Sequence, residues 1–209
     1  GGLGVHVSSR TRIVPIYLID MSSRYVEWAS RSTLDPMAHV ILGLLLLWPQ
    51  SFYDLTKSFE AGVSLFYSAS TGSIKRALDR LLADDLIRVE SETGPRQKKT
   101  YAVTEAGRTE FRRWMLSELS GTDVDGAMLA RVHFLGLVDA DERPTVAARI
   151  DERLRRDLGR LERLEAEISG KEVPAGFEDV ARYQLATLQY GLASHRAALS
   201  WSEEYLPKH

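Results

Sequence analysis

Apolar and polar residues follow two different periods in the segment from residue 71 to residue 108. Between 71 and 84 the apolar residues recur at helical spacing, which predicts a helix with its charged side chains outside. Its inward positions are Ile74, Leu78, Leu81 and Leu82. The segments LIRVES (86–91) and KTYAVT (99–104) then alternate with a period of two. With ETGPRQK between them, they predict a β-hairpin with an open loop rather than a tight turn.

Further helices are predicted on both sides of this segment. Asp35-Pro36 supplies an N-cap and a first-turn proline, and the apolar run that follows predicts a buried helix ending at Trp48. The residues SFYD at 51–54 have the form of a capping box, which predicts a short second helix. Thr104 is expected to cap another helix after the hairpin. The predicted order is therefore helix, helix, helix, hairpin, helix.

The second half of the chain has the pattern of a helical domain. A short amphipathic helix is expected over 126–138, and a longer one begins at Pro144. A last helix, from about Glu178 to Tyr205, carries a seven-residue repeat with intermediate positions, as in a coiled-coil seam. The seam consists of Leu185, Leu188, Leu192, His195, Leu199 and Leu206. Two antiparallel helices can pack through such faces, and a surplus apolar face favours a second subunit. The candidate dimerisation residues are Leu185, Leu188, Leu192, His195 and Leu199, with Leu192 and Leu199 expected at or near the interface.

Composition argues against several functions. The chain has no cysteine, which excludes a disulfide framework and a thiol nucleophile and suits a reducing cytoplasm. No serine lies in a nucleophile-elbow context and no glycine-rich phosphate loop occurs, so no enzyme is predicted. The five histidines lack metal-ligand spacing, so neither a metal nor a cofactor is expected. The longest apolar run, 40–48, is far shorter than the roughly 20 residues of a membrane helix.

The charge distribution limits how nucleic acid could be bound. Residues 1–120 carry 15 Lys and Arg against 13 Asp and Glu, whereas residues 121–209 carry 12 against 16. The overall charge therefore does not predict a protein that coats nucleic acid without regard to sequence, and any anion-binding site must be local. Residues 1–32 are expected to be an N-terminal extension, native or added, without the pattern of a secretory signal. Within it, 13–19 favours a short strand or an adhesive edge, and Met21 is a candidate start.

Three helices followed by a two-stranded hairpin predict a winged helix-turn-helix. The expected fold class is mostly α (α+β), with the winged helix over 33–120 and an α-helical dimerisation domain over 121–209. In such a fold the third helix can enter the major groove, while cations of the wing contact adjacent phosphates. Basic residues stand at both places, near the start of the third helix and in the hairpin loop.

Four segments together have a distinctive pattern. They are ILGLLLLWPQSFYDL (41–55), YSASTGSIKRALDRLLADDLIRV (67–89), GPRQKKTYAVTEAGR (94–108) and LARVHFLGLV (129–138). Over roughly residues 37–205 the chain resembles the PadR family of transcriptional regulators, in its longer branch with a virulence-activator-like C-terminal domain. The resemblance implies a homodimer joined through the C-terminal helices and the first helix. It also implies binding to palindromic promoter DNA, usually as a repressor that a small molecule releases.

The candidate DNA-binding residues follow from the pattern and the resemblance together. They are Tyr53, Ser70, Thr71, Ser73, Lys75, Arg76, Arg80, Arg96, Lys98 and Lys99. Tyr53 occupies the position of a phosphate-contacting tyrosine of the family. The chain departs from the family at Phe52 and Asp85, where glycine is usual, and at Lys75-Arg76, where Tyr-Pro is usual. The family's base preference therefore does not carry over.

Other interpretations of these residues stay open at this point. The charged residues could be solvated surface groups, and Arg76 could pair with Asp79, or Arg80 with Asp84, along the helix. A small aromatic effector is a candidate partner, with a pocket formed by Phe66, Trp114, Tyr183, Tyr190 and Trp201, although core or dimer packing is the more common role of such residues. The alternative function is a protein-interaction module that keeps the winged-helix scaffold without binding DNA.

Overall fold

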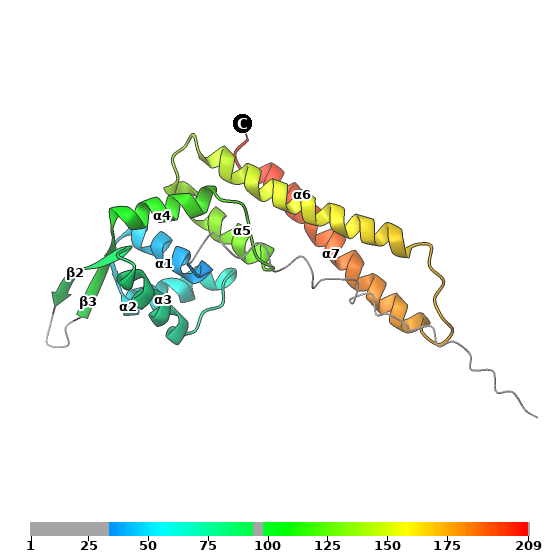
Figure 1. The fold of residues 1–209 in the computed structure, drawn as a ribbon, viewed down its shortest axis with the longest axis horizontal. Helices are drawn as coiled ribbons and strands as arrows, with labels where there is room; N and C mark the ends of the chain where they lie inside the picture. Colours follow the sequence, from blue (N-terminus) through cyan, green and yellow to red (C-terminus); the bar gives the residue numbers. More distant parts are fainter. Residues whose placement is uncertain (1–33, 94–97, 209) are drawn as a thin grey trace, which may run out of the picture. The chain divides into compact units, whose positions relative to one another are not determined.

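The computed structural model describes residues 34–93 and 98–208, which form one compact unit with a small sheet and many helices (Figure 1). The N-terminal extension and Arg96 therefore lie outside the described residues. The predicted fold class is confirmed. The elements in chain order are α1 (Pro36–Leu47), β1 (Gln50–Ser51), α2 (Phe52–Ala61), η2 (Val63–Leu65), α3 (Thr71–Ala83), β2 (Ile87–Thr93), β3 (Lys98–Val103), α4 (Glu105–Leu116), α5 (Val124–His133), η3 (Leu135–Leu137), α6 (Arg143–Ile168) and α7 (Glu178–Tyr205).

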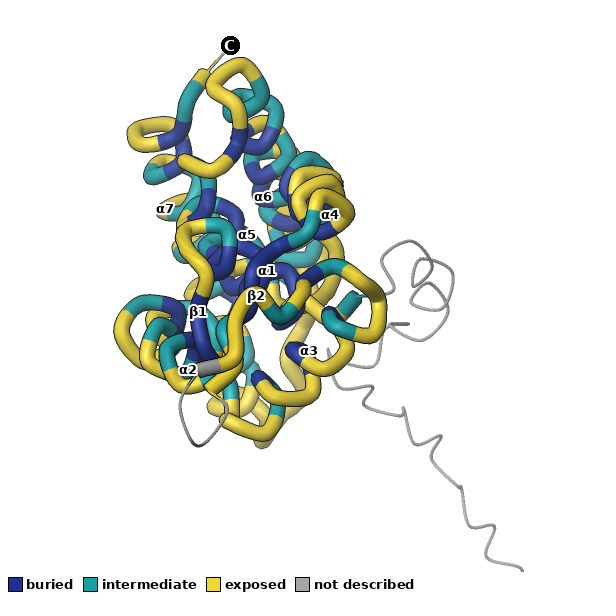
Figure 2. Tube along the Cα trace, turned by 90° about the vertical axis from the view of Figure 1, so that its left-hand side faces the viewer, coloured by how far each residue is buried: buried dark blue, intermediate teal, exposed yellow. Residues whose placement is uncertain are grey.

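Helix α1 is the centre of the core. Asp35 caps it by accepting a hydrogen bond from the Met37 backbone N–H at 3.0 Å, and Pro36 occupies its first turn. Every residue from Met37 to Leu45 is buried, as the dark tube at α1 shows (Figure 2). Helices α3 and α4 and strand β3 pack against it. An apolar sequence on all sides of a helix requires neighbours on all sides, and α1 has them.

The sheet is antiparallel, in the order β1-β3-β2. The predicted hairpin of β2 and β3 is confirmed, with an irregularity between Val89 and Ser91. The sheet also has a third strand that the sequence did not predict, because β1 pairs Gln50 with Tyr101. The buried Gln50 amide fixes this strand by donating to the Leu44 carbonyl at 2.7 Å. A two-residue strand is too short to produce an alternating pattern, so the sequence carries no signal for it.

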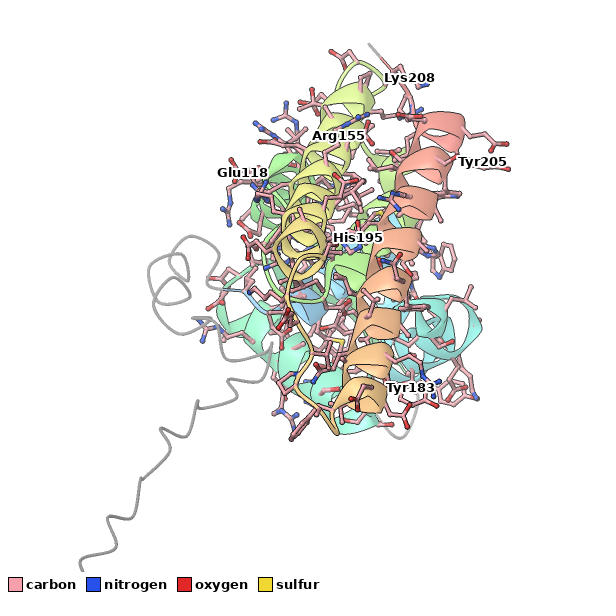
Figure 3. All side chains as sticks on the ribbon, turned by 90° about the vertical axis from the view of Figure 1, so that its right-hand side faces the viewer. Glu118, Arg155, Tyr183, His195, Tyr205 and Lys208 are labelled. Atoms are coloured by element: carbon pink, nitrogen blue, oxygen red, sulfur yellow. The ribbon has the colours of Figure 1, made fainter. Side chains whose placement is uncertain are left out.

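Helices α6 and α7 pack against each other as an antiparallel pair, here called the arm (Figure 3). Polar contacts run along the pair, from Ser202 and Asp151 near one end to Gln189 and Glu165 farther along. The turn between the helices contains Gly176, whose φ of 87° is the left-handed conformation that glycine adopts readily. The predicted bounds of α7 are confirmed.

The arm is attached to the rest of the unit by buried and surface contacts. Arg153 of α6 donates to the carbonyls of Leu119 and Gly121 at 2.8 and 2.9 Å, and it pairs with Asp157 at 2.7 Å. The side chains of Arg153 and Asp157 are only 13% and 11% exposed. An Arg112–Glu142 ion pair joins α4 to the segment just before α6. The arm therefore begins from a fixed junction after α4.

Candidate nucleic-acid interface

Helix α3 buries one side and presents the other to solvent. Ser70 caps it by accepting a hydrogen bond from the Ser73 backbone N–H at 3.1 Å. The buried side consists of Ile74, Ala77, Leu78 and Leu81. Thr71, Lys75, Arg76 and Arg80 are exposed, and Ser73 is half-buried. The predicted orientation of the helix is confirmed, apart from Leu82, which is only partly buried.

The cations of α3 differ in their electrostatic environment. Lys75 forms an ion pair with Asp79, and the Nε of Arg80 donates to Asp84 at 2.6 Å. Among the residues that the structure describes, no carboxylate lies within ion-pair distance of Arg76. Of the two predicted pairs, Arg80–Asp84 is confirmed, whereas Asp79 is taken by Lys75. Arg76 is thus the cation of this face that is free to bind another molecule.

The wing presents two more lysines. The Nζ of Lys98 lies 3.4 Å from the Asp54 carboxylate, and the Nζ of Lys99 lies 3.2 Å from that of Glu92. Their side chains remain 57% and 48% exposed. Both lysines can therefore exchange a carboxylate for a phosphate without leaving a buried group unpaired.

An open groove of about 470 Å³ runs between the start of α2 and strand β3. It is lined by Ser51, Phe52, Tyr53, Lys98, Lys99 and Tyr101. Tyr53 is 65% exposed, and Lys57 lies 5.9 Å from its ring centroid. Lys98 and Lys99 can turn from their exposed carboxylate partners to an anion in the groove, so the groove suits a phosphate.

Asp54 controls the charge of this groove, and sequence reasoning did not give it that role. The predicted capping box is confirmed, because Ser51 and Asp54 exchange hydrogen bonds. The hydrogen bonds from the Ser51 hydroxyl and backbone N–H, together with Lys98, lower the pKa of the Asp54 carboxyl. Asp54 therefore stays ionised and holds Lys98 at the groove. The capping box itself is the sequence signal for Asp54, but its pairing with a distant lysine depends on the sheet.

The five candidate effector residues do not meet in one place within the described chain. Phe66 packs against His133, with ring centroids 5.4 Å apart, and Trp201 stacks on Tyr205 at 6.2 Å. Tyr183 and Tyr190 are 64% and 76% exposed on α7. The structure thus contradicts one pocket shared by all five side chains in a protomer, because Tyr183 and Trp201 lie about 27 Å apart along the single helix α7.

The remaining member, Trp114, belongs to the core. Its ring stacks on His39 at 4.9 Å, and the Arg131 guanidinium lies 4.6 Å from its centroid. Burial lowers the pKa of Arg131 to about 10, and its guanidinium donates to the Trp114 carbonyl at the end of α4. A cation at a helix C-terminus is favourable, so this cluster has a structural role.

The leucine seam of α7 faces α6. Leu188 and Leu192 are buried in the described protomer, Leu199 is half-buried and Leu185 is 44% exposed. His195 lies with its Nδ1 2.9 Å from the Gly191 carbonyl. The expectation that Leu192 lies at or near the subunit interface is corrected for direct contact, because its side chain is fully buried within the protomer, whereas the half-buried Leu199 stays a candidate.

Neither a candidate metal site nor a candidate membrane-spanning helix is present in the described part of the chain. No group of histidine, aspartate and glutamate side chains there could hold a metal ion. No helix among the same residues combines the length and the apolar character needed to cross a membrane.

Comparison with known proteins identifies the families that this chain resembles. Residues 41–113 match the sequence profile of the transcriptional regulator PadR-like family, and residues 127–209 match that of the virulence activator alpha C-terminal domain. A probable transcriptional regulator of Mycobacterium tuberculosis is 31% identical over 88 residues, which cover 41% of this chain and 47% of that protein. The match thus spans about half the length of that relative.

A second relative is similar over most of its length. The negative transcriptional regulator PadR of Bacillus subtilis is 24% identical over 174 residues, which cover 81% of this chain and 95% of that protein. The crystal structure of that protein in complex with operator DNA aligns with 82% of this chain and with 98% of the solved chain. The two are 22% identical in sequence, and the TM-score is 0.40. The complex of the same protein with p-coumaric acid covers 80% and 95% at 21% identity, with a TM-score of 0.38.

Proposed function

Because the chain belongs to the PadR-like family of transcriptional regulators, we propose that it binds double-stranded promoter DNA and represses transcription there. The observation that carries the proposal is the exposed cationic face of α3 together with the exposed lysines of the wing. This function belongs in the cytoplasm, and we assign the protein no enzymatic activity.

The mechanism divides the work between two kinds of contact. Helix α3 lies in the major groove, where base edges differ in their donors and acceptors. The hydroxyls of Ser70, Thr71 and Ser73 at its start suit phosphates, as do Tyr53 and the lysines of the groove beside α2. Phosphate contacts of this kind supply affinity and fix the position on the duplex, while α3 reads the sequence.

A homodimer is part of the proposal, and the outer face of α7 is its interface. The residues of this face recur alternately four and three positions apart, and none of them is charged. They are Tyr183, Thr187, Tyr190, Ser194, Ala197 and Trp201. An uncharged stripe with two exposed tyrosines on a long helix suits the two-fold contact of a dimer. Two copies of α3 about 34 Å apart would then read the halves of a palindrome.

Light scattering tests the dimer. The parent chain should have a mass of about 47 kDa, twice its 23.5 kDa. Tyr190→Asp should shift it towards the monomer, because it places a carboxylate in the interface. Ala166→Asp on the exposed surface of α6 is the matched control. A parent mass near 23.5 kDa would refute the dimer, and a Tyr190→Asp protein that stays dimeric would move the interface elsewhere.

DNA binding is tested with the fragment upstream of the protein's own gene. Fluorescence anisotropy should show tighter binding to this fragment than to random DNA of equal length, and transcription from it in vitro should fall when the protein is added. No preference for any promoter fragment would favour the alternative, a protein-interaction module built on the same scaffold. Increased transcription would replace repression by activation and leave DNA binding intact.

A small aromatic effector completes the proposal, with p-coumaric acid as the first probe. An effector must bind the free and DNA-bound forms with different affinity, because otherwise it cannot shift the equilibrium between them. Titration should therefore change the DNA affinity together with tryptophan fluorescence. Quenching at constant DNA affinity would remove this compound as an effector.

A further inference from the structure

We propose that Arg76 reads a guanine in each half of the operator, opposite the first two turns of α3. The inference rests on the proposed function, because it specifies the DNA that α3 binds. It concerns the residue that sets sequence specificity, and it commits to one base.

The first argument is the division of the cations on α3. Lys75 and Arg80 each have a carboxylate one turn farther along the helix, at Asp79 and Asp84. Contact with DNA through either cation competes with an ion pair that already exists. Arg76 has no such partner among the residues that the structure describes, so its guanidinium keeps its hydrogen-bonding capacity for a ligand.

The second argument is the direction of the Arg76 side chain. A Cβ added at Gly72, one turn earlier, would lie only 3.6 Å from the Arg76 guanidinium nitrogen Nη1. The side chain therefore extends towards the start of α3, over a residue that has no side chain. In helix-turn-helix proteins the N-terminal residues of the recognition helix are the ones that contact base edges. Arg76 thus extends towards the end of the helix that contacts base edges in such proteins.

The third argument decides between a base and a phosphate. Base edges carry no net charge, so they are read by directed hydrogen bonds rather than by attraction between charges. The Arg76 guanidinium, which has no carboxylate partner among the described residues, can donate such bonds. The phosphate contacts have an alternative place in the groove beside α2, where Lys98 and Lys99 lie. The α3 surface around Arg76 therefore suits base edges.

Guanine follows from the chemistry of the guanidinium. Its planar fork donates two parallel hydrogen bonds, and guanine presents two acceptors, O6 and N7, on its major-groove edge. Adenine replaces one acceptor by an amino donor, and thymine and cytosine offer no such pair. Lysine keeps the charge but not the fork, so Arg76→Lys separates base reading from simple attraction to phosphate.

The experiment selects DNA from a random duplex pool with the full chain. The parent should enrich a motif with a fixed guanine in each half. Arg76→Lys should lose the preference at that position only, while the control Arg160→Lys on α6 keeps it. In the parent, replacing this guanine by 7-deazaguanine, which lacks the N7 acceptor, should weaken binding about tenfold or more. The Arg76→Lys protein should respond much less.

Each result decides between defined outcomes. A motif without a fixed guanine, or one that Arg76→Lys leaves unchanged, overturns the inference while the proposed DNA binding stands. The same holds if 7-deazaguanine does not weaken binding by the parent, a test that needs no variant and so does not depend on how a variant folds. If the parent enriches no motif, the proposed function fails and the inference fails with it.

Discussion

The wing lysines give the most direct quantitative test of the interface. In the free protein Lys98 and Lys99 pair with Asp54 and Glu92, and all four groups are on the surface. On binding, each lysine can move to a phosphate and displace the cation that was condensed there. The double change Lys98→Ala and Lys99→Ala should remove both contacts. It should leave the fold intact, because neither lysine is buried.

The expected magnitude follows from the number of contacts. Each phosphate contact contributes about 0.9 to the slope of log K against log salt concentration, so two contribute about 1.8 per protomer. Between 50 and 200 mM salt, a slope of that size corresponds to roughly a twelvefold change in affinity. For two protomers on one operator the slope change doubles to about 3.6. These are upper values, because the carboxylates of Asp54 and Glu92 attract cations from solution once the lysines have left them.

Fluorescence anisotropy at several salt concentrations measures this slope on operator and on random DNA. The double variant should lose affinity on both, because phosphate contacts carry no sequence information. The matched control is the double change Arg160→Ala and Arg163→Ala on α6, which removes the same two positive charges as the wing variant. It should leave the slope unchanged. Glu92→Gln should act in the opposite direction, since it frees Lys99. A slope that is the same in the parent and the double variant would refute the role of the wing.

Three further predictions concern stability. Gly107→Ala should lower the melting temperature, because the added Cβ would collide with a backbone oxygen, and such overpacking costs about 1–3 kcal/mol. The control Gly136→Ala places its Cβ in open space and should leave the melting temperature unchanged. Equal melting temperatures of the two variants by circular dichroism would contradict this. Burial lowers the pKa of His39 below 6.5, so the unfolded chain takes up the proton first and stability should fall as the pH drops below about 6.5. His39→Gln should flatten part of this fall in urea titrations, and an unchanged pH profile would exclude the histidine as its cause. Arg153→Met should cost about 3–5 kcal/mol by urea denaturation, because it leaves a buried carboxylate unpaired. Replacing that carboxylate as well by an apolar residue should recover part of the loss, and no recovery would argue against an unpaired charge.

Local chemistry explains why the helices could be predicted closely. Each of the caps Asp35, Ser51, Ser70 and Thr104 accepts a hydrogen bond from a backbone N–H two or three residues later. Such contacts involve only neighbouring residues, so the sequence contains all that they require. Strand β1 lacks a local cause, because it exists only where β3 is there to pair with it.

The candidate interface divides in the same way. The pair Arg80–Asp84 could be expected from its spacing along the helix, and it is present. The contact between Lys98 and Asp54 could not, because it forms only when the sheet brings β3 beside the start of α2. The competition between Arg76 and Lys75 for Asp79 also depends on side-chain directions that spacing alone does not decide.

The arm shows why a leucine repeat does not identify its own partner. A seam on α7 suits α6 of the same protomer as well as α7 of another, and contact inside the protomer buries Leu188 and Leu192. The face that remains is the uncharged stripe around Tyr190, which the leucine pattern does not reveal. In the proposed homodimer this face joins the subunits, while Arg112 and Arg153 fix the start of the arm to α4 and to the segment after it. The distance between the two copies of α3 then depends on the junction as well as on the interface. A ligand that altered this junction would change the fit to both halves of an operator without touching DNA.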